Sequence, residues 1–329
     1  MHRVVCRSCL PYYWDFSEPA DRHYAKGNYD LPGMYRNRIE HFRKVQNMKK
    51  HKLFSIRLYV QILYTLLTNG YLYGFMNGKI YKGSLKQVCV PGLNCYSCPG
   101  AIASCPLGAL QAALNERNIQ VPFAVLGFFF IFGSLLGRFV CGWLCPFGLL
   151  QDLLHKIPLF RKRKQLPHHS ILKYGKYVVL LGLVIIGSSF LFTGFAKIPA
   201  FCKYLCPSGT FMGALPLLSA NEALRDQAGE LFYWKLGILI VLIILSIKIY
   251  RPFCQYLCPL GAIYGWFNRF SLVQIHWEKD ACVSCMACQK ACPVNLPPEK
   301  ISISPECIKC GTCIRVCPAD CLHFKKCHK

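Results

Sequence analysis

The chain lacks the short motifs that mark several common enzyme classes. Its 329 residues contain no phosphate loop of the Walker type and no convincing dinucleotide fingerprint. No Ser, His and acid arrangement typical of hydrolases is evident. No histidine lies in the middle of an apolar segment, which argues against a haem held between helices. The sequence therefore predicts no catalytic residues for these chemistries.

Acidic residues are scarce as well. Asp and Glu number 15 against 39 Lys and Arg, which gives a formal net charge of +24, while 53% of the residues are hydrophobic. Nucleic-acid binding would need a basic, aromatic-rich face on a soluble domain. Here the basic residues flank apolar segments instead, as in membrane proteins. We therefore expect the lipid bilayer as a partner and no nucleic acid. No secretory signal is expected, because Met1 to Leu10 is polar and basic.

Cysteine is the residue type that carries most information. Two runs near the C-terminus, which begin at Cys282 and Cys307, have the bacterial ferredoxin spacing C-x2-C-x2-C-x3-C-P. In this pattern the fourth cysteine of each run binds the cluster of the other run. The predicted ligands of cluster 1 are Cys282, Cys285, Cys288 and Cys317, and those of cluster 2 are Cys307, Cys310, Cys313 and Cys292. Zinc ribbons, the alternative, use two cysteine pairs separated by a longer gap. The ferredoxin cysteines must remain thiolates bound to iron, so we expect the C-terminal region in a reducing compartment.

Four apolar segments precede the ferredoxin runs. They cover residues 53–75, 121–140, 174–195 and 231–250, and the first contains Arg57 and Gln61. A helix needs about 20 apolar residues to cross about 30 Å of hydrocarbon. The predicted fold is mainly α, with four transmembrane helices and a C-terminal α+β double [4Fe–4S] ferredoxin domain. The expected divisions are a basic segment 1–52, a membrane domain 53–270 and a ferredoxin domain 271–329. Buried core helices are the alternative for the apolar segments.

Basic residues in the loops predict the topology. The loop 141–174 contains six Lys and Arg residues, whereas the loop 196–230 contains three that are matched by three acids. We expect a multi-pass protein of the cytoplasmic membrane with both termini in the cytoplasm. Loops 76–120 and 196–230 would then face outward. The basic residues Lys79, Lys82, Lys86 and Arg117 in the first outer loop do not follow this rule.

A repeated Cys-Pro-x-Gly unit accompanies the apolar segments. The four units begin at Cys105, Cys145, Cys206 and Cys258. Three have a second cysteine four residues earlier, at Cys141, Cys202 and Cys254, and the first unit has Cys98 seven residues earlier. Cysteines at i and i+4 lie on the same side of a helical turn, and the following proline suits the start of a new helix. Four copies indicate internal duplication.

Each unit would present two sulfur atoms, which is half of a cluster. The predicted topology places Cys141, Cys145, Cys254 and Cys258 at the inner face, and Cys98, Cys105, Cys202 and Cys206 at the outer face. We therefore predict up to four [4Fe–4S] clusters. Cys89 and Cys95 are alternative outer-loop ligands, and the pairs could instead form redox disulfides or pack as apolar residues. No role is assigned to Cys6, Cys9, Cys321 and Cys327.

Residues 53–318 resemble the NapH/NosR-type membrane polyferredoxins. The resemblance lies in residues 141–146 and 254–259, each a CxxxCP motif, in the stretch 92–99, and in both ferredoxin runs. It implies electron transfer at the cytoplasmic membrane and exchange with quinone or quinol, or with an FMN-binding redox partner protein. Typical members have two CxxxCP motifs, whereas this chain has three and a variant. The large flavin-binding domain of the NosR branch is absent, so that any flavin would belong to a separate protein.

The expected function is electron transfer through [4Fe–4S] clusters between the cytoplasmic ferredoxin domain and an outward-facing or quinone or flavin partner. The chain would then be the electron-transfer subunit of an oxidoreductase, of the quinol dehydrogenase or flavoprotein reductase type. One alternative is a thiol–disulfide relay through the CxxxC pairs, which would bind no iron. Another is a redox-sensing or maturation factor that uses its clusters without turnover.

Overall fold

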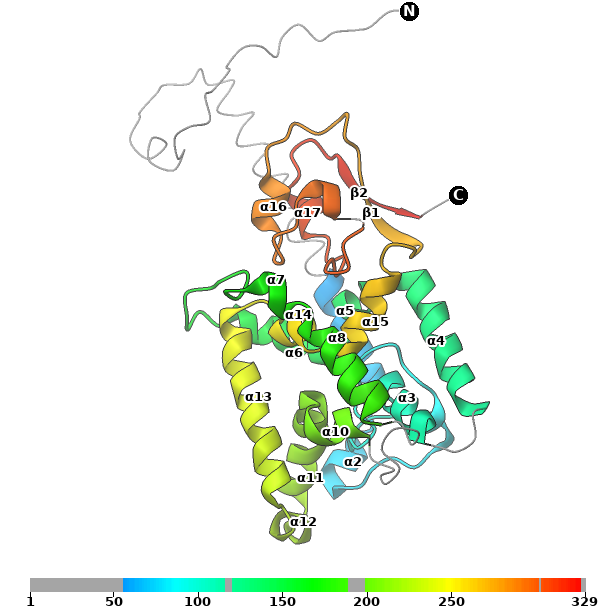
Figure 1. Ribbon diagram of the computed structural model, residues 1–329. Helices are drawn as coiled ribbons and strands as arrows, with labels where there is room; N and C mark the ends of the chain where they lie inside the picture. The colour runs from blue at the N-terminus through cyan, green and yellow to red at the C-terminus, as the bar shows by residue number, and fades with distance from the viewer. Residues whose placement is uncertain (1–55, 116–119, 189–198, 302, 327–329) are drawn as a thin grey trace, which may run out of the picture. The chain divides into compact units, whose positions relative to one another are not determined.

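The computed structural model describes residues 56–115, 120–188, 199–301 and 303–326 (Figure 1). The predicted basic segment 1–52 lies outside these residues, as do Cys6, Cys9 and Cys327. The described part is mainly helical, as the sequence predicts, and its strands lie in the C-terminal region.

Two of the four apolar segments form helices long and apolar enough to cross a membrane among the described residues. One is α13, Glu230–Lys248. The other runs from His169 to Ile186 and comprises α7 (His169–Leu172), α8 (Gly175–Val179) and the π-helical stretch η2 (Leu180–Ile186). Helix α4, Gln120–Leu136, has 17 residues. At about 1.5 Å per residue it spans roughly 26 Å, somewhat less than the hydrocarbon core.

The first apolar segment is helical at residues 56–69. Its two polar interruptions face the protein, because Arg57 and Gln61 are buried and both donate to the carbonyl oxygen of Gly142. Small elements follow before the first Cys-Pro-x-Gly unit, namely α2 (Leu72–Asn77) and η1 (Ser84–Gln87). Four crossings remain a prediction for this chain.

Each Cys-Pro-x-Gly unit begins a helical stretch, as its proline predicts. Pro106, Pro146 and Pro259 are the first residues of α3 (Pro106–Asn115), α6 (Pro146–Lys156) and α15 (Pro259–Phe267). After Cys206 the chain forms η3 (Gly209–Ala214), α11 (Leu215–Ala220) and α12 (Glu222–Asp226). The preceding cysteines lie on short helices, α5 (Phe139–Trp143), α10 (Ala200–Tyr204) and α14 (Pro252–Tyr256). The chain therefore turns at each second cysteine.

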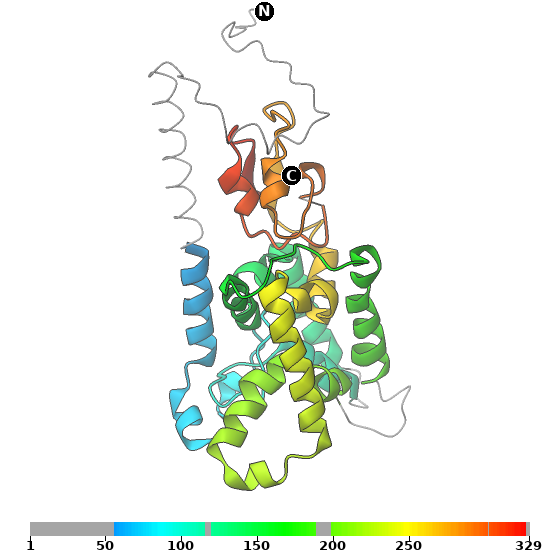
Figure 2. The ribbon, with the colours of Figure 1, turned by 90° about the vertical axis from the view of Figure 1, so that its left-hand side faces the viewer.

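The core joins the two duplicated halves. Helix α6 packs against α13, and α15 packs against α4 and α8 (Figures 1 and 2). The rings of Phe147 on α6 and Phe253 on α14 meet edge to face at 5.3 Å. Six of the cysteines from the repeated units belong to the same buried cluster, which places sulfur atoms inside the core.

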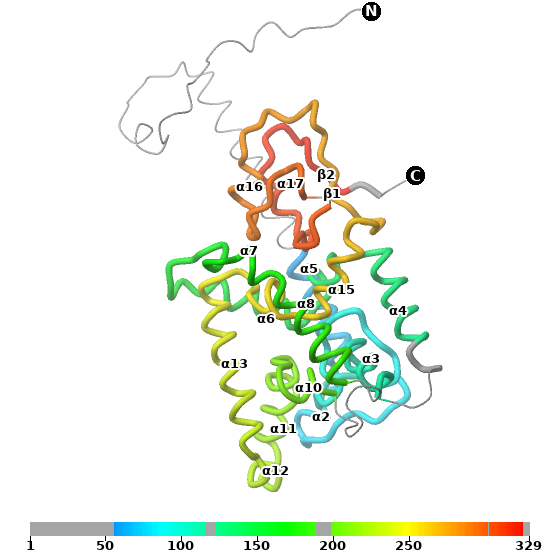
Figure 3. The backbone as a smooth tube through the Cα atoms, viewed as in Figure 1, coloured from blue at the N-terminus to red at the C-terminus, as the bar shows by residue number. Residues whose placement is uncertain are grey.

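The C-terminal region contains a small antiparallel sheet. Strand β1 (Val273–Trp277) pairs with β2 (Leu322–Lys326), with Ile275 opposite Phe324. Along the chain, three short helices lie between the two strands: α16 (Ala287–Ala291), η4 (Pro298–Lys300) and α17 (Thr312–Val316). This part of the chain is coloured from orange to red in Figure 3. Helices α16 and α17 pack together and carry the third cysteine of each ferredoxin run.

The second ferredoxin run contacts the helical part directly. The indole Nε1 of Trp143 donates to the carbonyl oxygen of Lys309 at 3.0 Å, and the amide of Asn268 donates to that of Cys307 at 3.0 Å. Gly142 is required at this contact, because a Cβ there would lie 2.2 Å from the carbonyl oxygen of Ile308.

Near this contact lies a buried ionic network. The carboxylate of Asp152 accepts hydrogen bonds from Arg251, with Nε at 2.7 Å, and from Arg57. Burial opposes ionisation of Asp152, but the two guanidinium groups outweigh it and hold the pKa of the carboxyl below its ordinary value. Arg251 is 1% exposed, so that its charge depends on this partner.

Replacing Asp152 with Asn should destabilise the fold strongly. The substitution leaves two buried guanidinium groups without their counter-charge, and loss of one partner of a buried pair costs about 3–5 kcal/mol. The measurement is the free energy of unfolding of the detergent-solubilised protein in denaturant. Asp226→Asn, at an exposed position, is the matched control and should change it little. Equal effects of the two substitutions would contradict the assignment.

Candidate iron–sulfur sites

The ferredoxin cysteines gather across the two runs. Cys313 interacts electrostatically with Cys310, Cys307 and Cys292, and all four line one small cavity beside the start of α17. In the other group Cys288 lies close to Cys285 and Cys317. Cys282 and Cys317 both lie next to Cys321. In each group, the fourth cysteine of one run therefore lies beside cysteines of the other run.

The inner-face cysteines also lie together. Cys141 and Cys145 stand where α5 gives way to α6, and Cys254 and Cys258 stand where α14 gives way to α15. All four are buried, and the thiol of Cys258 is within electrostatic range of the other three. The two halves of the chain thus bring one pair each to a single place, which is the arrangement predicted from the topology.

A glutamine supports this group. The buried side chain of Gln151 donates from Nε2 to Cys254 Sγ at 3.2 Å, and its Oε1 accepts from the backbone N–H of Phe253 at 3.2 Å. A second donor is the backbone N–H of Gly261, 3.4 Å from Cys258 Sγ. Such N–H groups stabilise negative charge on sulfur.

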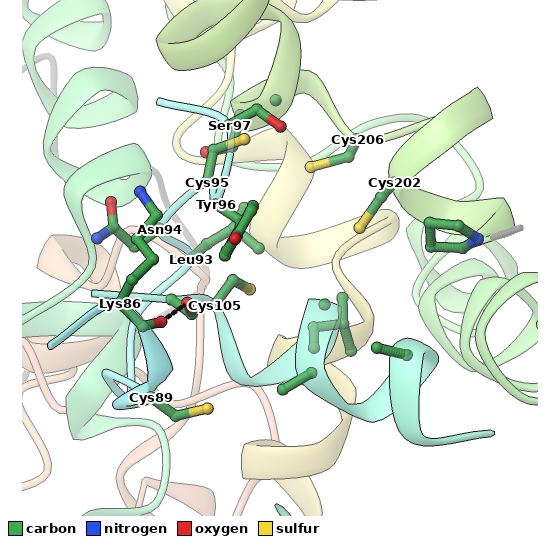
Figure 4. Close-up of a pocket in the computed structure, with 18 of the residues that line it drawn as sticks. Lys86, Cys89, Leu93, Asn94, Cys95, Tyr96, Ser97, Cys105, Cys202 and Cys206 are labelled. Atoms are coloured by element: carbon green, nitrogen blue, oxygen red, sulfur yellow. Dashed lines mark hydrogen bonds between the residues drawn. The ribbon is translucent and has the colours of Figure 1, made fainter. Parts of the chain in front are cut away.

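Three of the four cysteines predicted for the outer face line a large cavity of about 1640 Å³. Cys105, Cys202 and Cys206 line it, as predicted, and the fourth cysteine near them is Cys95 (Figure 4). The thiol of Cys206 is within electrostatic range of Cys202, Cys95 and Cys105. Cys98 is fully buried and is absent from the described lining. Cys89 lines the cavity too and stands apart from the other sulfur atoms in Figure 4.

Cys95 lies against the segment that follows Cys206. Its sulfur is at van der Waals distance, 3.4 and 3.7 Å, from the Cβ positions of Gly213 and Gly209. Sequence spacing cannot choose between Cys95 and Cys98, because both belong to one turn, in which the N–H of Cys98 donates to the carbonyl oxygen of Cys95 at 3.1 Å.

The support from glutamine recurs at this second group. Gln111 is buried, its Nε2 donates to Cys202 Sγ at 3.2 Å, and its Oε1 accepts from the backbone N–H of Phe201 at 3.0 Å. Gln111 and Gln151 each follow a unit cysteine by six residues, so that the first two units read Cys-Pro-x-Gly-x-x-Gln. Sequence reasoning missed these residues, although the extended repeat could have revealed them.

Cationic groups accompany both sets of thiols. Arg138 donates from Nη2 to the carbonyl oxygen of Cys254 at 2.9 Å, and Lys235 donates from Nζ to that of Cys202 at 3.2 Å. Lys86, which does not follow the loop-charge rule, is buried and donates to the carbonyl oxygen of Ala101 at 2.6 Å. Thiolates bound to iron carry net negative charge. Nearby cationic groups would stabilise that charge, whereas neutral cysteines that only pack in the core would not need them.

The donor sets fit iron–sulfur clusters. In the described residues no three Cys, His, Asp or Glu side chains are close enough to hold a single metal ion. A cubane cluster binds each thiolate to a different iron and therefore takes its sulfur ligands from farther apart. Four thiols at each place, with N–H donors aimed at sulfur, satisfy that requirement.

Family comparisons agree with this chemistry. A model of a 4Fe-4S binding domain matches residues 118–167, 178–220 and 231–279, and a second 4Fe-4S binding domain matches residues 275–296. An uncharacterized protein of Methanocaldococcus jannaschii is 30% identical over 201 residues, which are 58% of this chain and 74% of that protein. The chain belongs to the NapH/NosR-type polyferredoxin family.

Other relatives of this polyferredoxin have descriptive names. The methylamine utilization ferredoxin-type protein MauN of Paracoccus denitrificans is 29% identical over 57% of this chain and 60% of its own length. The regulatory protein NosR of Stutzerimonas stutzeri is 31% identical over 49% of this chain and 20% of its own length. The chain thus spans less than two thirds of either relative. No solved structure matches it. The polyferredoxin is an iron–sulfur electron-transfer protein.

Replacing Gln151 with Leu should lower the midpoint potential of the iron–sulfur signal that depends on Cys254. The substitution removes an N–H bond to sulfur that stabilises the more negative, reduced form. An EPR-monitored redox titration measures this shift. Gln111→Leu is the matched control and should shift only a signal that depends on Cys202. If the two variants alter the same signal, the glutamines do not serve separate sites.

Proposed function

We propose that this polyferredoxin conducts electrons through four [4Fe–4S] clusters between the ferredoxin domain and a partner on the outer side of the membrane. The observation that carries the proposal is the glutamine–thiol arrangement, built twice with the same atoms and similar distances. One such repeat would be unremarkable packing. Two, each within a set of four thiols, favour two equivalent cofactor sites beyond the ferredoxin pair.

The cluster ligands follow from the four groups of thiols. The ferredoxin domain would use the two sets predicted from the cysteine runs. The inner-face cluster would use Cys141, Cys145, Cys254 and Cys258. For the outer-face cluster we propose Cys95 together with Cys105, Cys202 and Cys206, because Cys95 shares the cavity with these three cysteines. When bound, the clusters supply one-electron redox chemistry.

The contact between Gly142 and Ile308 supports a route between the two regions. Gly142 follows Cys141, an inner-face cysteine, and Ile308 follows Cys307, a ferredoxin cysteine. The absent side chain at Gly142 lets the two backbones touch. The residues that hold two neighbouring cofactors are therefore in direct contact, which shortens the distance that an electron must cross.

The proposed location is the cytoplasmic membrane, with four crossings and both termini in the cytoplasm. Two long apolar helices and the basic loop 141–174 support this arrangement. The outward partner would be a quinone or quinol, or an FMN-binding protein, as the family resemblance implies. Lys82, Lys86 and Lys235 line the outer cavity together with the thiols. Their positive charge would suit a partner that carries negative charge when it is reduced. The chain would act as the electron-transfer subunit of an oxidoreductase.

Iron and sulfide analysis of anaerobically purified protein tests the cluster assignment. Four clusters require about sixteen irons per chain, and about eight would mean that only the ferredoxin pair is loaded. Cys95→Ser should remove about four irons, whereas Cys98→Ser, the matched control three residues away, should remove none. The opposite result would restore Cys98 as the ligand. A colourless, iron-free protein would leave only the thiol–disulfide relay.

Gly142→Ala should slow electron transfer between the ferredoxin and membrane clusters without loss of iron. Its new Cβ would overlap the carbonyl oxygen of Ile308 and force the two backbones apart. The measurement is rapid-freeze EPR after reduction of the ferredoxin clusters. Gly127→Ala is the control, because a Cβ there meets no atom within 4 Å. Unchanged rates in the Gly142 variant would exclude this contact from the route.

A further inference from the structure

The first ferredoxin site contains a fifth thiol. Cys321 lies beyond the two ferredoxin runs, yet its Sγ is 3.3 Å from Sγ of Cys317, and it also interacts with Cys282. Both neighbours are ligands of cluster 1 in the ferredoxin spacing. Cys321 is 3% exposed, so the thiol faces the site and not the solvent.

The backbone holds Cys321 in this place. Asp320 has a left-handed conformation with φ +47°, which turns the chain back after Cys317. The carbonyl oxygen of Cys321 then accepts from the N–H of Glu278 at 2.9 Å. Strand β2 begins at the next residue, with Leu322 opposite Trp277. The thiol is therefore fixed by the sheet.

The second ferredoxin site shows what normally occupies this position. Asn295 has φ +57° at the same distance after Cys292 as Asp320 has after Cys317. The next residue there is Leu296, which lines the cavity with Cys292, Cys307, Cys310 and Cys313. The two turns are equivalent, and both place the following side chain at the cluster site. One site has the apolar side chain of Leu296 there, and the other has the thiol of Cys321.

The site also has a feature that favours a reserve. Cys285 is exposed, in contrast to the buried Cys288. The side chain of Trp277 interacts with Cys282, a ligand of the same cluster in the ferredoxin spacing. The site of cluster 1 therefore combines an exposed ligand, Cys285, with a buried thiol, Cys321, that the ferredoxin spacing does not use.

We propose that Cys321 is a reserve ligand of cluster 1, which takes over the iron of Cys317 when that bond is lost. In the exchange the bond from iron to Cys317 breaks and one from iron to Cys321 forms. Cys321 loses its proton to water, the released Cys317 thiolate gains one, and no electron is transferred. The short distance between the two sulfur atoms lets the exchange proceed without movement of the backbone. The inference rests on the presence of cluster 1.

Iron and sulfide counts on the full chain, purified without oxygen, test this proposal. Cys317→Ala should keep the wild-type iron content, with an altered EPR signal for cluster 1, because Cys321 replaces the lost ligand. The double variant Cys317→Ala/Cys321→Ala should lose about four irons. Cys292→Ala is the matched control, because Leu296 stands where a reserve would be needed, and it should also lose about four. Cys292→Ala/Leu296→Cys should regain them.

Two results would overturn the proposal. Cys317→Ala would lose about four irons if Cys321 could not bind, and Cys321→Ala alone would lose about four if Cys321 were an ordinary ligand. Failure of the cluster assignment is recognised separately, because Cys282→Ala would then leave the iron content unchanged.

Discussion

The double hydrogen bond of a buried glutamine to a cysteine and its neighbouring backbone is the interaction on which the helical part depends. Gln111 on α3 hydrogen-bonds with Phe201 and Cys202 on α10, and Gln151 on α6 hydrogen-bonds with Phe253 and Cys254 on α14. Each glutamine comes from one unit and its partner from another far along the chain. If a glutamine separated from its partner helix, polar groups would be left unpaired in the core, which costs roughly 1–3 kcal/mol. This constraint keeps thiols from distant segments together.

Buried charge joins the ferredoxin domain to the helices. Glu306, directly before the second ferredoxin run, pairs with Arg138 at 3.1 Å and with Lys176. Arg138 in turn donates to the carbonyl oxygen of Cys254. The same guanidinium thus contacts the ferredoxin domain and the inner-face cysteines. Buried ion pairs add little net stability, but they penalise any arrangement that leaves one partner alone. These ion pairs therefore favour one specific docking of the ferredoxin domain on the helices, which fixes the two redox sites relative to each other.

Much of the fold could be predicted because its signals are local. The spacing of the ferredoxin runs indicates the cofactor, and the proline of each Cys-Pro-x-Gly unit predicts a helix start that the structure has. The apolar segment around Leu239 predicts α13. Arg57 and Gln61 reduced the apolar character of the first segment, yet both side chains bind the carbonyl oxygen of Gly142. That partner lies more than 80 residues away, and no local pattern reveals it.

By itself the sequence determined the ligand type, the ferredoxin domain and the places where helices break, because cysteine spacing and proline act over a few residues. Tertiary structure alone decided that Cys95 and not Cys98 lines the outer cavity, since Cys95 packs against Gly209 and Gly213 of a segment more than 100 residues away. It also decided that Gly142 meets Ile308 and that Cys321 lies against Cys317. These contacts form only when segments distant in the sequence pack together, and such packing produces no regular spacing of residues from which it could be predicted.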